Sequence, residues 1–286
     1  MRVLPALCVL LVACPERQAP ERGLMLTYKK PTSDPLRSVV DRRLAQLKLR
    51  ANLHEDGSTL TVRVAEGTDV SRIKALFAQT AHLEFCGEDG AVAGQWCEAS
   101  WPSGITTDSA MRACALLGPT RKALEAALGA DAGLAAADGG ADAGPGDAGA
   151  RTFAPAPRSI AFGTSGTQAT AFAVTGCFSP RVVAADVRDG KDQPGALSLE
   201  FDRAAGRDFA ALTTSLVGKR LIILLDGEVQ SAPVVREPIT GGKAMLTTGL
   251  HDREAMEVLA ASLVGGTLPV LVLEREGTWG PPSLKR

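Results

Sequence analysis

Residues 197–235 read LSLEFDRAAGRDFAALTTSLVGKRLIILLDGEVQSAPVV, and the order of patterns in this stretch decides the fold. Leu197 to Phe201 is predicted to be a strand. Asp202 is predicted to cap a helix, because a short carboxylate accepts hydrogen bonds from the free amides of a first helical turn. Apolar residues then recur at helical spacing, namely Ala205, Phe209, Leu212 and Leu216. Arg220 to Val235 alternates around Asp226-Gly227, a dipeptide typical of a tight hairpin turn.

The residues downstream continue this mixture of helices and strands. Pro238 to Gly242 is a Gly-rich turn, and Ala244 to Thr248 can form one more strand. A helix is predicted over Arg253 to Val264, and it ends at Gly265-Gly266 because glycine readily adopts the conformation that terminates helices. Val270 to Glu274 is then predicted to be the last strand.

The N-terminal half follows the same logic, in the order strand, helix, hairpin, helix, strand. Its signals are the strand Leu24 to Lys29, a helix starting at the cap Asp34 and Pro35, a hairpin turn at Asp56-Gly57, a helix over Val70 to Gln79 and a strand over His82 to Cys86. A βαββαβ order suggests a ferredoxin-like sheet with its helices on one face. The predicted fold class is α+β, with two ferredoxin-like βαββαβ-type subdomains joined by a flexible Ala/Gly/Asp-rich insert.

Composition sets the expected boundaries. The first subdomain is predicted over 24–86, the second over 158–275 and a tail over 276–286. The insert between them, 87–157, contains a stretch of Ala, Gly and Asp at 129–150 that lacks the apolar bulk to offset the entropy of ordering, so it is predicted to be disordered. On its two sides, Asp108 to Leu128 is predicted to be helical and Ser159 to Cys177 to form strands or a hairpin.

The N-terminus has the pattern of a processing segment. Arg2 precedes an apolar stretch too short to span a bilayer, and Leu11-Val12-Ala13-Cys14 looks like a bacterial lipobox. Residues 1–14 are therefore predicted to be a lipoprotein signal, with Cys14 lipidated and 15–23 serving as a tether; the alternative is an ordinary secretory signal cleaved nearby. Pro15 stands where some bacteria place an inner-membrane retention aspartate, which favours the outer membrane.

Four further cysteines, Cys86, Cys97, Cys114 and Cys177, would lie in an oxidising compartment, where an even count fits two disulfides. Three pairings are possible. The expected one joins Cys86 to Cys97, which close a short Gly-containing loop, and Cys114 to Cys177 across the linker. No pair of cysteines has the two-residue spacing of a zinc knuckle, so no metal site is predicted.

Bulk charge and missing motifs narrow the function. The formal net charge is −1 and aromatic residues make up 4% of the chain, which argues against binding nucleic acid. Gly163 to Thr167 lacks the second glycine of a nucleophile elbow, and Gly218-Lys219-Arg220 lacks the upstream glycine and the Ser/Thr of a phosphate-binding loop. The histidines His54, His82 and His251 are scattered. No catalytic, metal or cofactor site is predicted.

The stretch from Ser198 through Thr214, followed by Val217 to Gly242, resembles the first periplasmic domain of the SecD protein-export family. Val39 to Leu44 with Leu47, Thr80 to Phe85, Gly265 to Pro269 and Gly280 to Leu284 agree more loosely. In this family the domain is thought to hold the emerging polypeptide on the far side of the membrane, and intramembrane helices couple this to proton flow. The chain stops at Lys285-Arg286 without a hydrophobic span, so the resemblance implies the binding half alone, and any proton coupling would require a separate membrane partner. The Sec translocon is the other partner that the resemblance implies.

The best-matched stretch contains residues that serve turns and strand ends. Asp226-Gly227 gives a hairpin turn, Pro233 limits a strand to an edge, and Gly241-Gly242 allows positive φ. Together with Gly218, Lys219 and Arg220, these residues are expected to be mainly structural. The functional interpretation is that an edge at Gln230, Ser231, Ala232 and Pro233, together with Phe162 and Phe172 in Ser159 to Val174, receives an extended polypeptide by strand addition or small apolar pockets.

The sequence therefore predicts a non-enzymatic, lipid-anchored envelope protein that assists protein export by transient binding of exported or unfolded polypeptide. One alternative is a scaffolding lipoprotein with a single fixed partner. The other is a hydrolase or metal enzyme whose site the sequence does not reveal.

Overall fold

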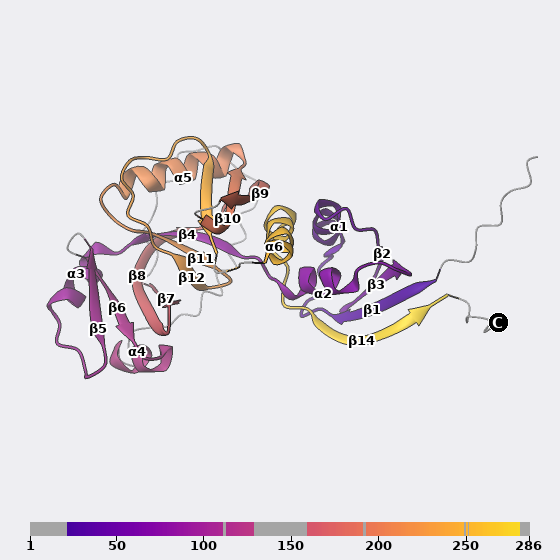
Figure 1. Ribbon diagram of the computed structural model, residues 1–286, viewed down its shortest axis with the longest axis horizontal. Helices are drawn as coiled ribbons and strands as arrows, with labels where there is room; N and C mark the ends of the chain where they lie inside the picture. Colours follow the sequence, from indigo (N-terminus) through magenta and orange to yellow (C-terminus); the bar gives the residue numbers. More distant parts are fainter. Residues whose placement is uncertain are drawn as a thin grey trace, which may run out of the picture.

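The computed structural model describes residues 22–110, 113–128, 159–190, 193–248, 250 and 252–280. Figure 1 shows these residues as two bodies side by side, with helix α6 (Arg253–Gly265) between them. We call the smaller body the four-stranded unit and the larger one the large unit. Cys14 and the Ala/Gly/Asp-rich stretch 129–150 lie outside the described residues.

The four-stranded unit is one antiparallel sheet with strand order β14-β1-β3-β2. Helices α1 and α2 lie along one face of it (Figure 1). Its elements are β1 (Gly23–Lys29), α1 (Arg37–Gln46), β2 (Asn52–Asp56), β3 (Thr59–Ala65), α2 (Val70–Ala78) and β14 (Val272–Trp279). Alternate residues of the strands, such as Leu26, Leu60 and Val62, are buried against the helices. This is the order of a βαββαβ unit whose last strand comes from the C-terminal part of the chain.

The prediction that His82 to Cys86 forms the last strand of this sheet is wrong. The strand there, β4 (Leu83–Glu88), leaves the sheet and pairs in the large unit with β8 and β11. Leu83 and the run Phe85 to Glu88 are buried, so β4 has buried side chains on both of its faces. A strand in the middle of a sheet that is packed on both faces meets this requirement. The largely exposed β14 instead suits the open edge beside β1. It extends to Trp279, beyond the predicted end at Glu274 and into the predicted tail.

Two local predictions in this unit also shift. Helix α1 begins at Arg37 without a side-chain cap of its own; the backbone amide of Leu36 donates to Glu55 Oε1 of β2 at 3.0 Å. Asp34 instead offers its carbonyl to Lys30 Nζ at 3.0 Å. In the hairpin, Asp56 pairs with Thr59, so the turn lies at Gly57 and Ser58, one residue later than predicted. A carboxylate distant in sequence thus replaces the local cap.

The large unit is built around a closed ring of strand pairings. The order β4-β11-β12-β7-β8 closes because β8 also pairs with β4. The strands are β7 (Ser159–Ser165), β8 (Gln168–Phe178), β11 (Leu221–Leu225) and β12 (Glu228–Ser231). They enclose a small apolar cluster of Cys86, Ala161, Val174, Ile222 and Leu224. The hairpin predicted within Ser159 to Cys177 is confirmed, and so is the turn at Asp226-Gly227, where φ is 53° and 79°.

The segment 90–128 extends this ring outward. It contains α3 (Gly90–Glu98), β5 (Thr106–Ala110), β6 (Ala113–Gly118) and α4 (Arg121–Leu128), with β6 paired to β8. The prediction of one helix over Asp108 to Leu128 is wrong for its first half. Thr106 to Ala110 pairs antiparallel with Ala113 to Leu117, so the helix α4 begins only after this hairpin, at Arg121.

The disulfides join Cys86 to Cys177 and Cys97 to Cys114, which corrects the predicted pairing (Cys86 to Cys97 and Cys114 to Cys177). Cys86 and Cys177 lie on the neighbouring strands β4 and β8, with their Cα atoms 4.0 Å apart. Cys97 on α3 faces Cys114 on β6, with their Cα atoms 5.3 Å apart. The pairing of β4 with β8 and the packing of α3 on β6 therefore set the partners, and closeness in sequence does not.

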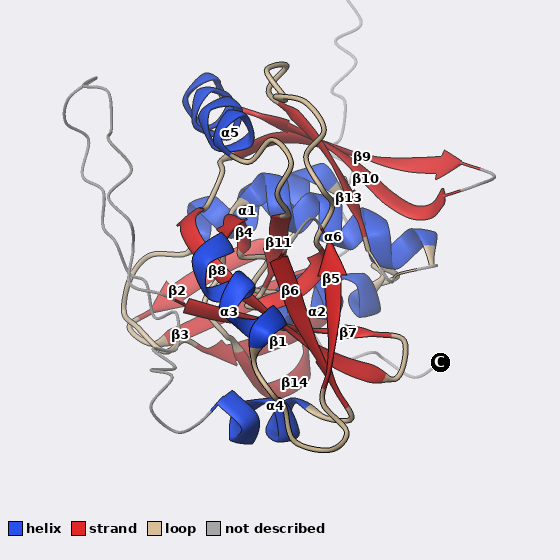
Figure 2. Cartoon of the chain, turned by 90° about the vertical axis from the view of Figure 1, so that its left-hand side faces the viewer, coloured by secondary structure: helices blue, strands red, loops and turns tan. Residues whose placement is uncertain are grey.

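A third sheet, β13-β10-β9, completes the large unit. It contains β9 (Val182–Gly190), β10 (Gln193–Phe201) and β13 (Lys243–Thr247), with α5 (Arg203–Ser215) packed beside β10. Figure 2 shows these strands and α5 at one end of the molecule. Asp202 caps α5 as predicted, accepting from the amides of Ala204 and Ala205. The strands expected to form one second ferredoxin-like sheet are divided between this sheet and the ring, because β11 and β12 pair with β4 and β7.

Helix α6 belongs to both cores. Met256, Leu259 and Leu263 pack in the core of the large unit, whereas Val258 and Ala261 pack in that of the four-stranded unit. A helix that is apolar on most of its surface must be covered on most sides. Helix α6 thus fixes the place where the two units meet.

Candidate functional site

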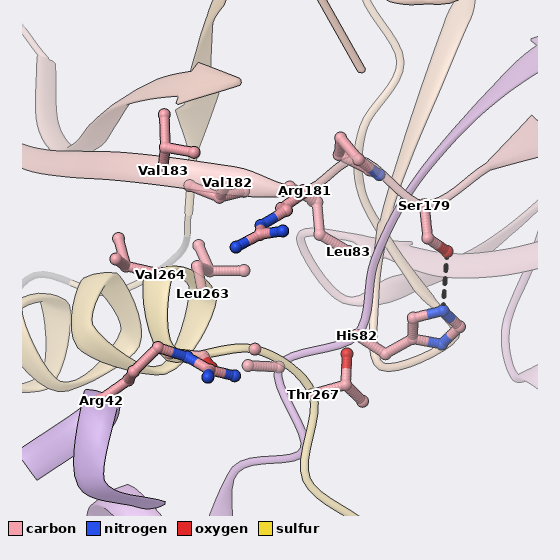
Figure 3. Close-up of a pocket in the computed structure, with 14 residues that line it drawn as sticks. Arg42, His82, Leu83, Ser179, Arg181, Val182, Val183, Leu263, Val264 and Thr267 are labelled. Carbon is pink, nitrogen blue, oxygen red and sulfur yellow. Dashed lines mark hydrogen bonds between the residues drawn. The ribbon is translucent and has the colours of Figure 1, made fainter. Parts of the chain in front are cut away.

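An open cavity of about 530 Å³ lies where the two units meet. Its lining comes from α1, from the chain entering β4, from the start of β9 and from the end of α6. The residues are Arg42, Ala81, His82, Leu83, Ser179, Pro180, Arg181, Val182, Val183, Leu263, Val264, Gly265, Gly266 and Thr267. Figure 3 shows Val182, Val183, Leu263 and Val264 on the apolar side of this space.

A fully buried guanidinium holds the floor of the cavity together. Arg43 on α1 donates to the carbonyls of Leu76, Gln79 and Thr80 at 2.7 to 2.9 Å. It also donates twice to the carbonyl of Gly266, at 2.7 and 3.0 Å. Burial lowers the pKa of Arg43 from its ordinary value to about 10, and the charge of Asp226 opposes this shift. Arg43 stays charged at neutral pH. It connects α1 to the two segments by which the chain passes from one unit to the other, at Gln79 to Thr80 and at Gly266.

The position of Gly265 depends on this arginine. A Cβ added at Gly265 would lie 2.2 Å from Cγ of Arg43 and 3.0 Å from its backbone nitrogen. Only glycine lets α6 end this close to α1. The same glycine offers its carbonyl to Arg42 Nε at 3.0 Å. The two adjacent arginines therefore anchor the end of α6 from α1.

The polar wall contains a histidine and a serine in contact. His82 Nε2 lies 2.8 Å from Ser179 Oγ (Figure 3). Asp226 does not complete a catalytic triad, because its carboxylate accepts from the backbone amide of His82 at 2.7 Å and from the hydroxyl of Thr80. Within the described residues, no side chain orients the other ring nitrogen of His82. A nucleophile needs a base held by a third group, so this pair lacks one part of a hydrolase site.

The predicted polypeptide-binding residues lie elsewhere, on the ring of strands. Gln230, Ser231 and Ala232 are half-buried and Pro233 is exposed. Strand β12 is not an open edge at its start, since Glu228 and Val229 pair with β11 on one side and with β7 on the other. Strand addition at that point is excluded, while Gln230 to Pro233 stays a prediction.

The two predicted phenylalanines are covered by arginines. Phe162 is 3% exposed and lies under Arg121, 4.7 Å from the ring centre, so the prediction that it contacts a client at the surface is corrected. Phe172 is half-buried beneath Arg220 at 5.7 Å. Phe162 packs in the apolar cluster of α3, β6 and α4, which accounts for its burial.

The motif residues of the best-matched stretch have structural contacts. Gly218, with φ of 80°, donates to the carbonyl of Val235, and Lys219 is exposed. Arg220 is buried and pairs with the buried Glu88 at 3.3 Å. Gly242, with φ of 63°, follows Gly241 and lies against Gly206, where a Cβ would be 3.2 Å from the Gly242 Cα.

Two features are absent from the described residues. These residues contain no helix long and apolar enough to cross a membrane. They also contain no group of three or more His, Cys, Asp or Glu side chains placed to hold a metal ion.

Residues 179–270 match the family model described as SecDF, P1 head subdomain. This segment is similar to a SecDF P1 head. The SecD of Acidaminococcus fermentans is 44% identical over 102 residues, which are 34% of this chain and 24% of the relative. The SecDF of Thermus thermophilus is 41% identical over 96 residues, 32% of this chain and 13% of the relative. The matched stretches thus span a quarter or less of these relatives.

Solved SecDF structures share the fold over a longer range than the P1 head match. One, in a super-membrane-facing form, has a TM-score of 0.56 at 18% identity and covers 94% of this chain and 32% of that one. Another, of a membrane component described as enhancing protein export, has a TM-score of 0.51 at 21% identity. It covers 88% of this chain and 98% of the other chain. The predicted resemblance to a SecD periplasmic domain is confirmed.

The P1 head match and the cavity are directly related. The match begins at Ser179 and ends at Val270, and the cavity is lined by Ser179 to Val183 and by Leu263 to Thr267. Both ends of the P1 head segment therefore lie at the cavity. Arg42 and the residues 81–83 add the side that precedes the match in sequence.

Proposed function

We propose that this chain assists protein export by transiently holding an extended polypeptide in the cavity between its two units. The observation that carries the proposal is the place of the cavity, at both ends of the segment similar to a SecDF P1 head. The relatives are named as protein translocase subunits, and one neighbour is described as enhancing protein export. A volume of about 530 Å³ has room for a few side chains of a client.

The walls suit a weak, sequence-tolerant grip. Val183 is 45% exposed, and with Val182, Leu263 and Val264 it offers apolar surface to aliphatic client side chains. Apolar contact contributes roughly 25 cal/mol per Å² of surface removed from water, so a partly open cavity gives modest affinity. Modest affinity favours release, which a factor that helps a chain move forward requires.

A second contact is proposed at Gln230, Ser231, Ala232, Pro233 and Phe172. Beyond Val229, β12 has no pairing with β7 among the described residues. An extended client can therefore approach Gln230 to Pro233 from that side, by the strand-addition mode predicted from the sequence. This contact would be secondary to the cavity.

We also propose that Cys14 anchors the chain to a membrane by its lipid, facing the periplasm, with the outer membrane favoured by Pro15 and the Sec translocon or another membrane protein as partner. Several acyl chains on one cysteine give stable attachment where one chain gives little. The variant Cys14→Ala is expected to move from the membrane fraction to the soluble fraction. Persistent membrane attachment of this variant would contradict the anchor.

In-cell photocrosslinking tests the binding function. A photoreactive amino acid replaces Val183 in the cavity, Ser231 at the second contact, or Arg207 on α5 as a control. Capture of many exported chains at Val183, fewer at Ser231 and few at Arg207 is expected. A single stoichiometric product at Val183 would favour the scaffolding alternative, and equal capture at all three positions would sink the proposal.

The hydrolase alternative is tested by Ser179→Ala. Because the His82–Ser179 pair lacks an orienting group, client capture and client integrity are expected to be unchanged in this variant. If the unmodified chain cleaved clients and Ser179→Ala did not, this result would support the hydrolase alternative.

A further inference from the structure

We propose that the cavity selects polypeptide segments that carry a carboxylate, which is bound between Arg42 and Arg181. This inference rests on the proposed function and adds the chemical class of the preferred client. Arg42 comes from α1 of the four-stranded unit, and Arg181 stands just before β9 in the P1 head match. Figure 3 shows the two guanidinium groups reaching toward the cavity from opposite sides.

Neither of these arginines has a carboxylate partner in the part of the chain that the structure describes. Other arginines do: Arg72 pairs with Glu254 and Glu257, and Arg121 with Glu125 and Glu228. Arg42 uses only Nε, which donates to Gly265, so both of its terminal nitrogens lack a described partner. The cavity thus holds two cations whose charge is uncompensated locally.

The lining also contains no Asp or Glu. Asp226, whose carboxylate contacts the backbone of His82, is occupied by the Thr80 hydroxyl and the His82 amide. The remaining polar side chains of the lining are His82, Ser179 and Thr267, which can donate hydrogen bonds, though the His82 ring already contacts Ser179. A site rich in donors and poor in acceptors favours an anion.

The form of the guanidinium group and the apolar wall define the ligand further. A planar guanidinium matches a carboxylate with two parallel hydrogen bonds. The valines and leucines beside it favour a carboxylate next to aliphatic side chains. A carboxylate that contacts both arginines would also join the two units, since each arginine belongs to a different one.

The test uses the full chain and three fluorescent peptides of one aliphatic-rich sequence. The first has two Glu and an amidated end, the second has Gln at both positions and an amidated end, and the third has the two Gln and a free C-terminal carboxylate. Dissociation constants come from fluorescence anisotropy at low salt. The Glu peptide is expected to bind about 5-fold tighter than the amidated Gln peptide, because two partly exposed ion pairs each contribute modestly. Salt should reduce this ratio toward 1.

Variants assign the effect to the two arginines. Arg42→Gln and Arg181→Gln should each reduce the Glu preference, and the double variant should abolish it, so that the Glu peptide and the amidated Gln peptide bind with equal affinity. Arg207→Gln, at an exposed position of α5, is the matched control and should keep the preference. If the third peptide binds as tightly as the first, a C-terminal carboxylate serves as well as a side chain.

The outcomes separate this inference from the proposed function. Equal binding of the Glu and Gln peptides to the unmodified chain would overturn carboxylate selection, while client capture at Val183 would still stand. An undiminished Glu preference in the double variant would also overturn it. Failure of every peptide to bind, together with no capture at Val183, would remove both proposals.

Discussion

Distant parts of the four-stranded unit are held together by packing, hydrogen bonds and ion pairs, whereas the segment 90–128 of the large unit is tied down by the disulfide between Cys97 and Cys114. In the first, Arg43 and the pairing of β1 with β14 connect residues more than 200 positions apart. In the second, the apolar cluster around Trp96 and Leu116 is smaller and rich in alanine. The difference indicates that covalent links stand in where the apolar core is too small to hold a segment.

The largest effect on stability is expected from Arg43→Met, which removes the hydrogen bonds that Arg43 makes in the four-stranded unit. The substitution leaves the buried carbonyl of Leu76 and the part-buried carbonyls of Gln79 and Gly266 without their donor. We expect a loss of about 4 kcal/mol in the free energy of unfolding, measured by urea denaturation. The neighbouring exposed residue gives the control, and Arg42→Met should cost about 1 kcal/mol or less. Similar losses in the two variants would contradict the role given to Arg43.

A smaller effect is expected from removing the covalent link between α3 and β6. The double variant Cys97→Ala, Cys114→Ala opens a loop with a sequence separation of 17, which should cost about 3 kcal/mol. Amide hydrogen exchange should show the loss of protection in α3, β5 and β6, with the four-stranded unit unchanged. Loss of protection spread evenly over both units would mean that they do not differ in the way described.

The smallest effect at neutral pH concerns Tyr28 in the core of the four-stranded unit. Its hydroxyl is buried and has no hydrogen-bond partner among the described residues. Tyr28→Phe should therefore raise the free energy of unfolding by about 1 kcal/mol at pH 8. Thermal melts of the two proteins provide the measurement, and a destabilised variant would reveal a partner for the hydroxyl.

The same pair of proteins should diverge at alkaline pH. Burial, with a contribution from Glu276, raises the pKa of Tyr28 to about 12. The unfolded chain then releases this proton near pH 10 and the folded chain only near pH 12, so stability is lost as pH rises between these values. The loss specific to Tyr28 should reach about 2 kcal/mol and be missing from Tyr28→Phe. Parallel pH profiles of the two proteins would rule this out.

Local features of the fold could be predicted from the sequence because they depend on a few neighbouring residues. The Asp202 cap and the Asp226-Gly227 turn are of this kind. The pairing of β14 with β1 in the four-stranded unit could not be predicted, because strand alternation indicates which face is buried and not which strand is the neighbour. The prediction of the disulfide pairing was wrong for the same reason, because both pairs depend on which strands and helices come together in space.

The candidate site could be predicted only in part. The SecD resemblance predicts a polypeptide-binding role, but the residues predicted for it, Gln230 to Pro233 with Phe162 and Phe172, lie away from the cavity. The cavity joins residues from four separate segments, and none of them carries a motif. One signal was present: Arg43 lies three positions after Val40 and next to Leu44, on the apolar face of its helix. A charged residue at a core position predicts a buried hydrogen-bonding role, which Arg43 fulfils.

The central claim, that the cavity between the units holds an extended polypeptide, is tested most directly by hydrogen exchange of the full chain with and without a permanently unfolded client. We expect slower exchange at 81–83, 179–183 and 263–267 when the client is present, and unchanged exchange along α5. Unchanged exchange in those three segments at a client concentration that saturates binding would contradict the account.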